Sequence, residues 1–210
     1  MSERQLMLLT GLFAFCFSSM ADNITATLVC IAILLNLNLP TDKLLRYVVL
    51  VVFSVNAGGT ALITGAAGGI GAETSIALAN AGFRVFATDI DLDRLAQLES
   101  RASALDLTIE TLPLDITDAR NLARTRLEIR ERTEGGGVDL LVNNAGFAQL
   151  GPLEFLERRD LERQFDINVT GLMRVTRAFA AGMADRKQGR IINLSSIAGV
   201  FAFPLMGAYH

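Results

Sequence analysis

A glycine-rich stretch at residues 64–71 has the spacing of a loop that holds phosphate groups. It reads Thr64-Gly65-Ala66-Ala67-Gly68-Gly69-Ile70-Gly71 and directly follows a short apolar run at residues 61–63. Gly65 would permit a tight turn, Gly69 would let the main chain approach a pyrophosphate, and Gly71 would allow close helix packing. A helix beginning there would point its free N–H groups at the negative charge. The stretch therefore predicts a dinucleotide-binding loop, with candidate contacts at Thr64, Gly65, Gly68, Gly69, Ile70 and Gly71.

Asp89 stands at the end of the next apolar run, residues 84–88, and 18 positions after Gly71. A carboxylate at this place accepts hydrogen bonds from the ribose hydroxyls of the adenosine, and it repels a 2′-phosphate. The sequence therefore predicts NAD as the cofactor, with NADP less favoured. An alternative stays open, in which Asp89 begins the turn through Asp91 and Asp93 and caps the next helix.

Strands and helices alternate along residues 60–210, and this alternation must position the candidate residues. Apolar runs of strand length recur between stretches with apolar residues at helical spacing. Strands are expected at 61–63, 84–88, 108–113, 138–142 and 190–194, and helices at 70–81, 92–105, 119–133 and 161–183. Such repeated units build a parallel sheet covered on both faces, with ligands beyond the carboxyl ends of the strands. The sequence therefore predicts a Rossmann-like α/β fold with a doubly wound parallel sheet.

Two polar motifs follow later strands, Asp115-Ile116 and Asn143-Asn144-Ala145-Gly146. Together with the glycine loop, their order resembles the short-chain dehydrogenase/reductase family across residues 60–210. The resemblance implies that the first motif contacts the adenine, through the side chain of Asp115 and the main chain of Ile116. It implies that the second motif supports the sheet and lines the cofactor site. The candidate cofactor residues added in this way are Asp115, Ile116, Asn143, Ala145 and Gly146.

Asn168, Ser196 and Tyr209 lie where that family keeps its catalytic residues, and Ser196 and Tyr209 have its spacing of 13 positions. The resemblance implies that Tyr209 is the general acid and base, Ser196 stabilises the substrate oxygen, and Asn168 holds a water of the proton relay. Taken singly, Ser196 could be a strand-end cap, Tyr209 a half-buried aromatic residue and Asn168 a polar kink. Together they predict an NAD(P)-dependent oxidoreductase that transfers a hydride between the cofactor and an alcohol or ketone.

The active-site lysine of the family would fall at position 213, beyond the 210 residues of the sequence. We therefore expect the chain as given to be inactive or nearly so, with an incomplete sheet, an unpaired sheet edge and marginal stability. Phe147, Leu150, Phe155 and the stretch 200–205 indicate a site for an apolar alcohol or ketone. The family often forms dimers through the helix expected at 161–183, which predicts a homodimer.

The charge content of the sequence changes near residue 60. Residues 1–60 hold three of the 22 acidic and three of the 19 basic residues, which leaves 19 acidic and 16 basic residues for the remainder. The expected domains are an apolar helical segment at 1–59 and a cytoplasmic dinucleotide-binding domain at 60–210. No basic block indicates a nucleic-acid partner. Cys16 and Cys30 are too few for a disulfide framework and lack metal-ligand spacing, so no metal site is predicted.

Three apolar stretches lie in the first segment, at 6–20, 24–39 and 47–55. Each is shorter than the roughly 20 residues that span a bilayer. A membrane association of residues 5–57 is nevertheless an open alternative, because the segment is apolar and poor in charge. Asp22 or Asn23 could simply cap a helix. The alternative function is a membrane antiporter fragment fused to a non-catalytic dinucleotide-binding module, because three motifs resemble sodium/proton antiporters of the NhaD type. These motifs are Phe13-Ala14-Phe15, Ser18-Ser19-x-Ala21-Asp22-Asn23-x-Thr25 and Asn56-Ala57-Gly58-Gly59.

Overall fold

The structure is a computed structural model that describes residues 59–209. The chain divides into two compact units, Met1–Gly58 and Gly59–His210. The expectations for residues 1–58, including the antiporter motifs and the membrane association, lie outside the described residues. Within residues 59–209, no helix is both long enough and apolar enough to cross a membrane.

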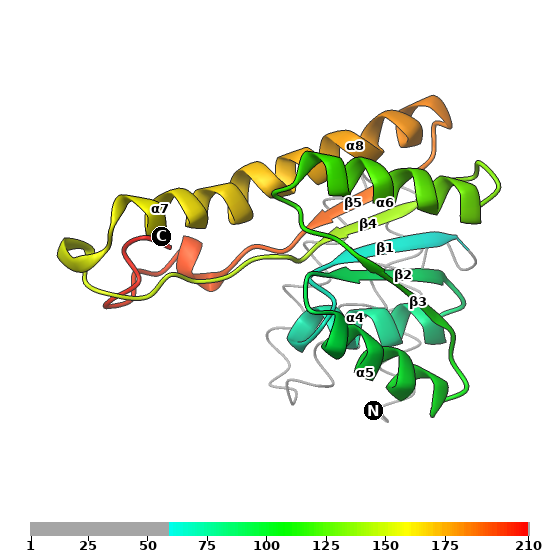
Figure 1. Cartoon of the computed structure of the whole chain (residues 1–210), viewed down its shortest axis with the longest axis horizontal. Helices are drawn as coiled ribbons and strands as arrows, with labels where there is room; N and C mark the ends of the chain where they lie inside the picture. Colours follow the sequence, from blue (N-terminus) through cyan, green and yellow to red (C-terminus); the bar gives the residue numbers. More distant parts are fainter. Residues whose placement is uncertain (1–58, 210) are drawn as a thin grey trace, which may run out of the picture. The chain divides into compact units, whose positions relative to one another are not determined.

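Five parallel strands form one sheet in the order β3-β2-β1-β4-β5 (Figure 1). The strands are β1 Thr60–Thr64, β2 Arg84–Asp89, β3 Ile109–Pro113, β4 Leu140–Asn143 and β5 Arg190–Asn193. β1 lies at the centre, where Leu62 is opposite Phe86 on one side and opposite Leu141 on the other. The chain passes from one half of the sheet to the other between β3 and β4. Sheets of this type bind their ligands at the carboxyl ends of the strands beside such a switch point.

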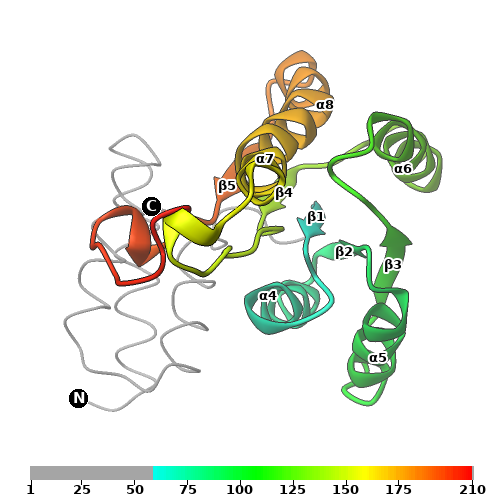
Figure 2. The ribbon, with the colours of Figure 1, turned by 60° about the vertical axis from the view of Figure 1, so that its left-hand side comes forward.

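Helices cover both faces of the sheet. Figure 2 shows α4 and α5 on one face and α6 and α8 on the other. Their bounds are α4 Gly69–Asn80, α5 Leu92–Ser103, α6 Ala119–Arg132 and α8 Leu172–Asp185. This arrangement confirms the predicted Rossmann-like α/β fold.

The three inner strands β1, β2 and β4 are buried on both faces, because apolar side chains fill most of their middle positions. Leu62, Ile63 and Phe86 are fully buried in the middle of the sheet. On the side of α6 and α8, Leu62 and Phe86 belong to a core cluster that also includes Ile129 and Val175. This packing fixes the carboxyl ends of the strands, where the candidate residues lie.

The single helix expected at 161–183 is interrupted in the structure. A π-helical turn, η2 (Asp166–Gly171), separates α7 (Arg158–Phe165) from α8. The turn packs closely, since a side-chain carbon at Gly171 would lie 2.8 Å from Ile116 Cδ1. Such turns occur often at functional sites, and η2 contains the candidate residue Asn168. The other expected bounds differ from the observed ones by one or two residues, as the ends of helices and strands commonly do.

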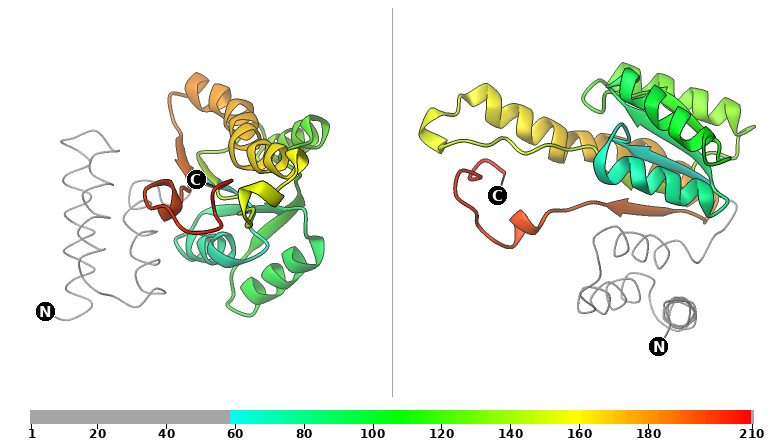
Figure 3. Two further views of the ribbon diagram at one scale, coloured as in Figure 1. Left: turned by 90° about the vertical axis from the view of Figure 1, so that its left-hand side faces the viewer. Right: turned by 90° about the horizontal axis from the view of Figure 1, so that it is seen from below.

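The segments that follow β4 and β5 extend beyond the carboxyl edge of the sheet, beside α7 (Figures 1 and 3). Each segment contains a short 3-10 helix, η1 (Leu153–Phe155) in the first and η3 (Ile197–Gly199) in the second. The segments are joined by a hydrogen bond from Gly151 N to Leu205 O of 2.8 Å. These two segments, residues 144–157 and 194–209, are called the wall below.

Candidate cofactor and active site

The glycine loop between β1 and α4 has the geometry that the sequence predicted. Gly65 has a φ of +64°, and a side-chain carbon there would lie 2.6 Å from Ala145 Cα. A side-chain carbon at Gly71 would lie 2.6 Å from the Asn144 amide nitrogen, so neither position has room for a larger residue. Gly69 differs, because no atom lies within 4 Å of the place that its side chain would take. The loop is therefore closed towards β4 and open at Gly69, where a ligand can approach.

Thr64 joins this loop to the end of β4 and is only 2% exposed. Its hydroxyl oxygen accepts hydrogen bonds from Asn144 N (3.1 Å) and Ala145 N (3.0 Å). The Asn144 side chain donates in return to Thr64 O (3.0 Å) and Gly65 O (2.7 Å). Thr64 thus positions the loop from within. Asn144 was not a candidate residue, although it belongs to the motif at 143–146 that could have identified it.

Asp89 is half-buried and turned towards the glycine loop. One carboxylate oxygen accepts a hydrogen bond from Ala67 N (3.0 Å) and the other from Asp91 N (3.0 Å). The cap of α5 is Asp91, whose side chain accepts from Arg94 N at 3.1 Å. Asp89 thus begins the turn to Asp91, as the alternative expected, but it does not cap the helix. Each oxygen of Asp89 keeps a further lone pair that a hydroxyl group could use.

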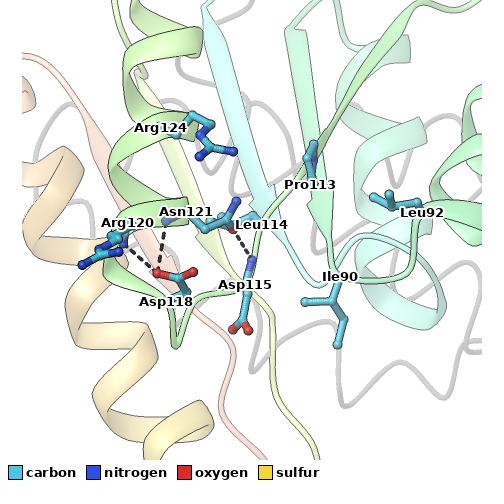
Figure 4. A pocket seen from close by; sticks show the side chains of 9 residues that line it. All are labelled: Ile90, Leu92, Pro113, Leu114, Asp115, Asp118, Arg120, Asn121 and Arg124. Carbon is cyan, nitrogen blue, oxygen red and sulfur yellow. Dashed lines mark hydrogen bonds between the residues drawn. The ribbon is translucent and has the colours of Figure 1, made fainter.

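A pocket of about 390 Å³ lies beside Asp115 at the carboxyl ends of β2 and β3 (Figure 4). One oxygen of Asp115 accepts from Thr117 N (2.8 Å) and Thr117 Oγ1 (2.7 Å), and Asp115 N donates to Asn121 Oδ1 (2.6 Å). The second carboxylate oxygen is not engaged in these bonds. Ile116 is 6% exposed, which suits a contact through its main chain. The lining residues are Ile90, Leu92, Pro113, Leu114, Asp115, Asp118, Arg120, Asn121 and Arg124.

Asn143 lies inside the protein and is 3% exposed. Its side-chain nitrogen donates to Thr176 Oγ1 (2.9 Å) and to Asn193 Oδ1 (2.8 Å). It therefore ties β4 to α8 and β5. This is the sheet-supporting role that the resemblance implied for the motif, whereas Ala145 and Gly146 are more accessible.

Asn168 binds the main chain of the segment after β4. Its side-chain oxygen accepts from Phe147 N (3.0 Å), and its side-chain nitrogen donates to Phe147 O (2.7 Å). Gly146 lies close to the same amide, since a side-chain carbon there would be 3.2 Å from Asn168 Oδ1. The π-helical turn thus directs Asn168 at the segment that leaves the cofactor edge.

Ser196 and Tyr209 both lie on the segment after β5. The Ser196 hydroxyl oxygen accepts a hydrogen bond from Ala198 N (3.1 Å) and caps η3. Tyr209 is half-buried in a turn closed by its N–H and Met206 O (2.8 Å). Within residues 59–209, no hydrogen bond joins the two hydroxyl groups. The readings of Ser196 as a cap and Tyr209 as a half-buried aromatic residue therefore describe the geometry seen here.

Comparisons with known proteins match the described part of the chain. Residues 59–210 match the family described as short chain dehydrogenase. Human 17-beta-hydroxysteroid dehydrogenase type 1 is 38% identical over 154 residues, which cover 70% of this chain and 46% of that protein. Sorbitol dehydrogenase of Cereibacter sphaeroides is 37% identical over 155 residues, which cover 72% of this chain and 58% of that protein. The chain spans about half the length of these curated relatives.

A solved structure shows the same likeness. The crystal structure of a metagenomic short-chain oxidoreductase in complex with NADP has a TM-score of 0.67 and 32% identity, covering 73% of this chain and 69% of that chain. Apart from Gly59, the antiporter resemblance concerns residues outside the matched range, and these relatives give it no support. The family match covers the sheet, the glycine loop and the motifs that follow β3, β4 and β5. The chain therefore belongs to the short chain dehydrogenase family.

Proposed function

We propose that the protein transfers a hydride between NAD(H) and an apolar alcohol or ketone. The observation that carries this proposal is the glycine loop after β1, which is open at Gly69 and faces the carboxylate of Asp89. In the oxidative direction, a nicotinamide held at the glycine loop would supply the acceptor for the hydride of the alcohol carbon. The side chains after β5 would receive the proton of the alcohol hydroxyl group, which leaves the ketone and the reduced cofactor as products.

The preference for NAD over NADP rests on Asp89. Its carboxylate is held in place by Ala67 N and Asp91 N, so it cannot turn away from a ligand without losing both bonds. Ribose hydroxyls can donate to its free lone pairs, whereas a 2′-phosphate would bring a second negative charge beside it. The Arg94 side chain lies near the glycine loop, where its Nη1 atom would be 3.7 Å from a side-chain carbon at Gly68. Its Nε atom forms an ion pair with Asp91 Oδ2 at 3.4 Å.

The proton path is assigned to three residues. Ser196 already accepts a hydrogen bond from Ala198 N, which leaves its own hydroxyl hydrogen available for the substrate oxygen. Tyr209 would then exchange the proton with that oxygen as general acid and base. Both ends of the Asn168 side-chain amide are bound to Phe147. Asn168 would therefore hold a water of the relay through its main chain.

The substrate is assigned as apolar because the wall beside the site exposes large apolar side chains. In the segment after β4, Leu150 is 59% and Phe155 is 77% exposed. In the segment after β5, Val200 is 80% and Phe201 is 59% exposed. A hydroxysteroid, for which one relative is named, has this character, whereas sorbitol, for which another is named, is polar.

Two further properties are proposed for the chain. A polypeptide of residues 1–210 alone should turn over far more slowly than one extended through position 213, where the family resemblance expects the active-site lysine. A homodimer should form through the helical run α7–η2–α8. Phe165, Val169 and Met173 are spaced by four residues on this run and are 61%, 46% and 55% exposed.

Titration of the protein with NADH and NADPH, followed by nicotinamide fluorescence, tests the cofactor site. We expect NADH to bind more tightly than NADPH. Turnover of 2-decanol and of sorbitol, measured on the 210-residue chain and on a chain lengthened through the family lysine, tests the substrate class and the slow turnover. Absence of binding by either nucleotide to either chain would sink the proposal, and faster turnover of sorbitol would overturn the apolar substrate.

A further inference from the structure

Gln164 is a buried polar residue on a short and highly charged helix. Its side chain belongs to α7 and is only 4% exposed. The side-chain oxygen accepts a hydrogen bond from Gln149 N (2.6 Å), and the side-chain nitrogen donates to Phe147 O (3.0 Å). A buried amide that is bonded at both ends is costly to disturb, because either unpaired group would lose its hydration without compensation.

Gln164 and Asn168 act on the same stretch of main chain. They lie four positions apart on a continuous helical run, and both bind Phe147 O. Asn168 also binds Phe147 N, and Gln164 also binds Gln149 N. The two side chains thus make the hydrogen bonds to the main chain of Phe147 and Gln149 that a neighbouring strand would make in a sheet. The segment at 147–149 is fixed along α7 without belonging to the sheet.

This segment connects the cofactor edge to the apolar wall. Before it lies the motif at 143–146, which is bound to the glycine loop through Thr64. After it lies Leu150, and then Gly151, whose N–H is bonded to Leu205 O at 2.8 Å. The Phe147 ring is additionally covered by the Arg163 guanidinium, at 5.0 Å from the ring centre. A shift of residues 147–149 would therefore displace Leu150 and Gly151, the neighbouring residues of the wall, relative to the glycine loop.

We infer that Gln164 is a positioning residue that fixes the apolar substrate wall relative to the cofactor edge. It acts through the main chain of Phe147 and Gln149 and does not touch the reacting atoms. The inference rests on the proposed function, because it assumes that the wall binds the substrate. Changes at Gln164 should alter substrate binding and leave cofactor binding nearly unchanged. The reason is that the Gln164 side chain is bonded to Gln149 and Phe147, and not to Asp89 or the glycine loop.

The variants follow from these contacts. Gln164→Met removes both hydrogen bonds at similar volume. Gln164→Glu keeps an acceptor for Gln149 N and removes the donor to Phe147 O. Gln97→Met is the matched control, because Gln97 is an exposed glutamine on α5, away from the wall.

The first measurement is amide hydrogen exchange of the full chain. We expect the Gln149 amide of Gln164→Met to exchange about tenfold faster than in the wild type. The Phe147 amide should keep its protection, since its acceptor is Asn168. Gln164→Glu should restore part of the protection at Gln149, and Gln97→Met should change neither amide.

The second measurement is binding of 2-decanone to the complex with NADH, followed by nicotinamide fluorescence. We expect Gln164→Met to raise the Kd of 2-decanone about tenfold and to leave the Kd of NADH within about twofold. Unchanged affinity for 2-decanone with intact NADH binding would overturn the inference alone. So would loss of NADH binding by both Gln164 variants, since the fold itself would then depend on this residue. Failure of the wild type to bind NADH would instead overturn the proposed function.

Discussion

The carboxylate of Asp89 is bonded to the main chain of the glycine loop and of the turn before α5. Its two oxygens accept hydrogen bonds from Ala67 N and Asp91 N, both at 3.0 Å. Because these donors are main-chain groups, the bonds hold the carboxylate and the loop at a fixed separation. The same negative charge that orders the loop should therefore also select between cofactors.

Removing this charge should weaken the proposed preference for NADH. We expect Asp89→Asn to lower the ratio of the NADPH Kd to the NADH Kd about tenfold, because the 2′-phosphate would no longer meet a carboxylate. Fluorescence titration with both nucleotides measures this ratio. Asp93→Asn is the matched control, because Asp93 is an exposed carboxylate in the first turn of α5. An unchanged ratio in Asp89→Asn would show that another residue decides the preference.

At the scale of elements, Glu110 joins β3 to two neighbours. It accepts from Arg84 of β2 at 2.7 Å and from Arg132 of α6 at 3.0 Å. Burial raises the pKa of the Glu110 carboxyl, and the hydrogen bonds from both arginines lower it; the net effect is a pKa below its ordinary value of 4.5. The ionised form is therefore favoured by folding.

The sign of the pH dependence follows from this lowered pKa. The stabilisation from Glu110 is complete above the pKa of the unfolded chain and is lost as the pH falls through the lowered pKa of the folded chain. We expect Glu110→Gln to reduce the free energy of unfolding by about 1 kcal/mol at neutral pH. Urea unfolding at neutral and acidic pH measures the change.

The difference between Glu110→Gln and the wild type should shrink below about pH 4. Glu154→Gln, at an exposed position of η1, is the control and should leave the unfolding curve unchanged at both pH values. A difference that stays constant or grows on acidification would contradict the assignment.

At the scale of the molecule, an exposed apolar stripe runs along α7, η2 and α8 within residues 59–209. Phe165, Val169 and Met173 form it, and none of them belongs to the core of the described residues. Exposed apolar patches of this kind mark interaction surfaces. The helical run also projects past the sheet, so a second copy could reach it (Figure 3).

A charge in the centre of this stripe should disrupt the proposed dimer. We expect Val169→Glu to raise the dimer Kd at least about tenfold, because the carboxylate would lose its hydration in the interface. Sedimentation velocity over a concentration series measures the shift. Leu127→Glu is the control, since Leu127 is a similarly exposed apolar residue on α6. A wild-type chain that sediments as a monomer throughout the series would disprove the dimer.

Much of the fold and the cofactor loop could be predicted from the sequence, because both depend on local rules. Strand and helix positions follow from apolar periodicity and, apart from the helix expected at 161–183, were expected to within one or two residues. The close contacts of Gly65 with Ala145 and of Gly71 with Asn144 are possible because glycine has no side chain, and the sequence alone identifies these residues as glycine. The place of Asp89 follows from its position at the end of a strand. The assignments of Ser196 and Tyr209 came only from the family resemblance and stay predictions.

The tertiary structure decided the contacts between residues far apart in the chain. Thr64 and Asn144 are 80 positions apart and meet because β1 and β4 are neighbours in the sheet. In the sequence, Gln164 is one polar residue among several on a charged helix. Only the packing of the folded chain buries its side chain and brings it to Gln149 N. The partners of Asn168 likewise depend on a π-helical turn that apolar periodicity does not reveal. Such bonds are selected by the burial of polar groups, which exists only once the chain has folded.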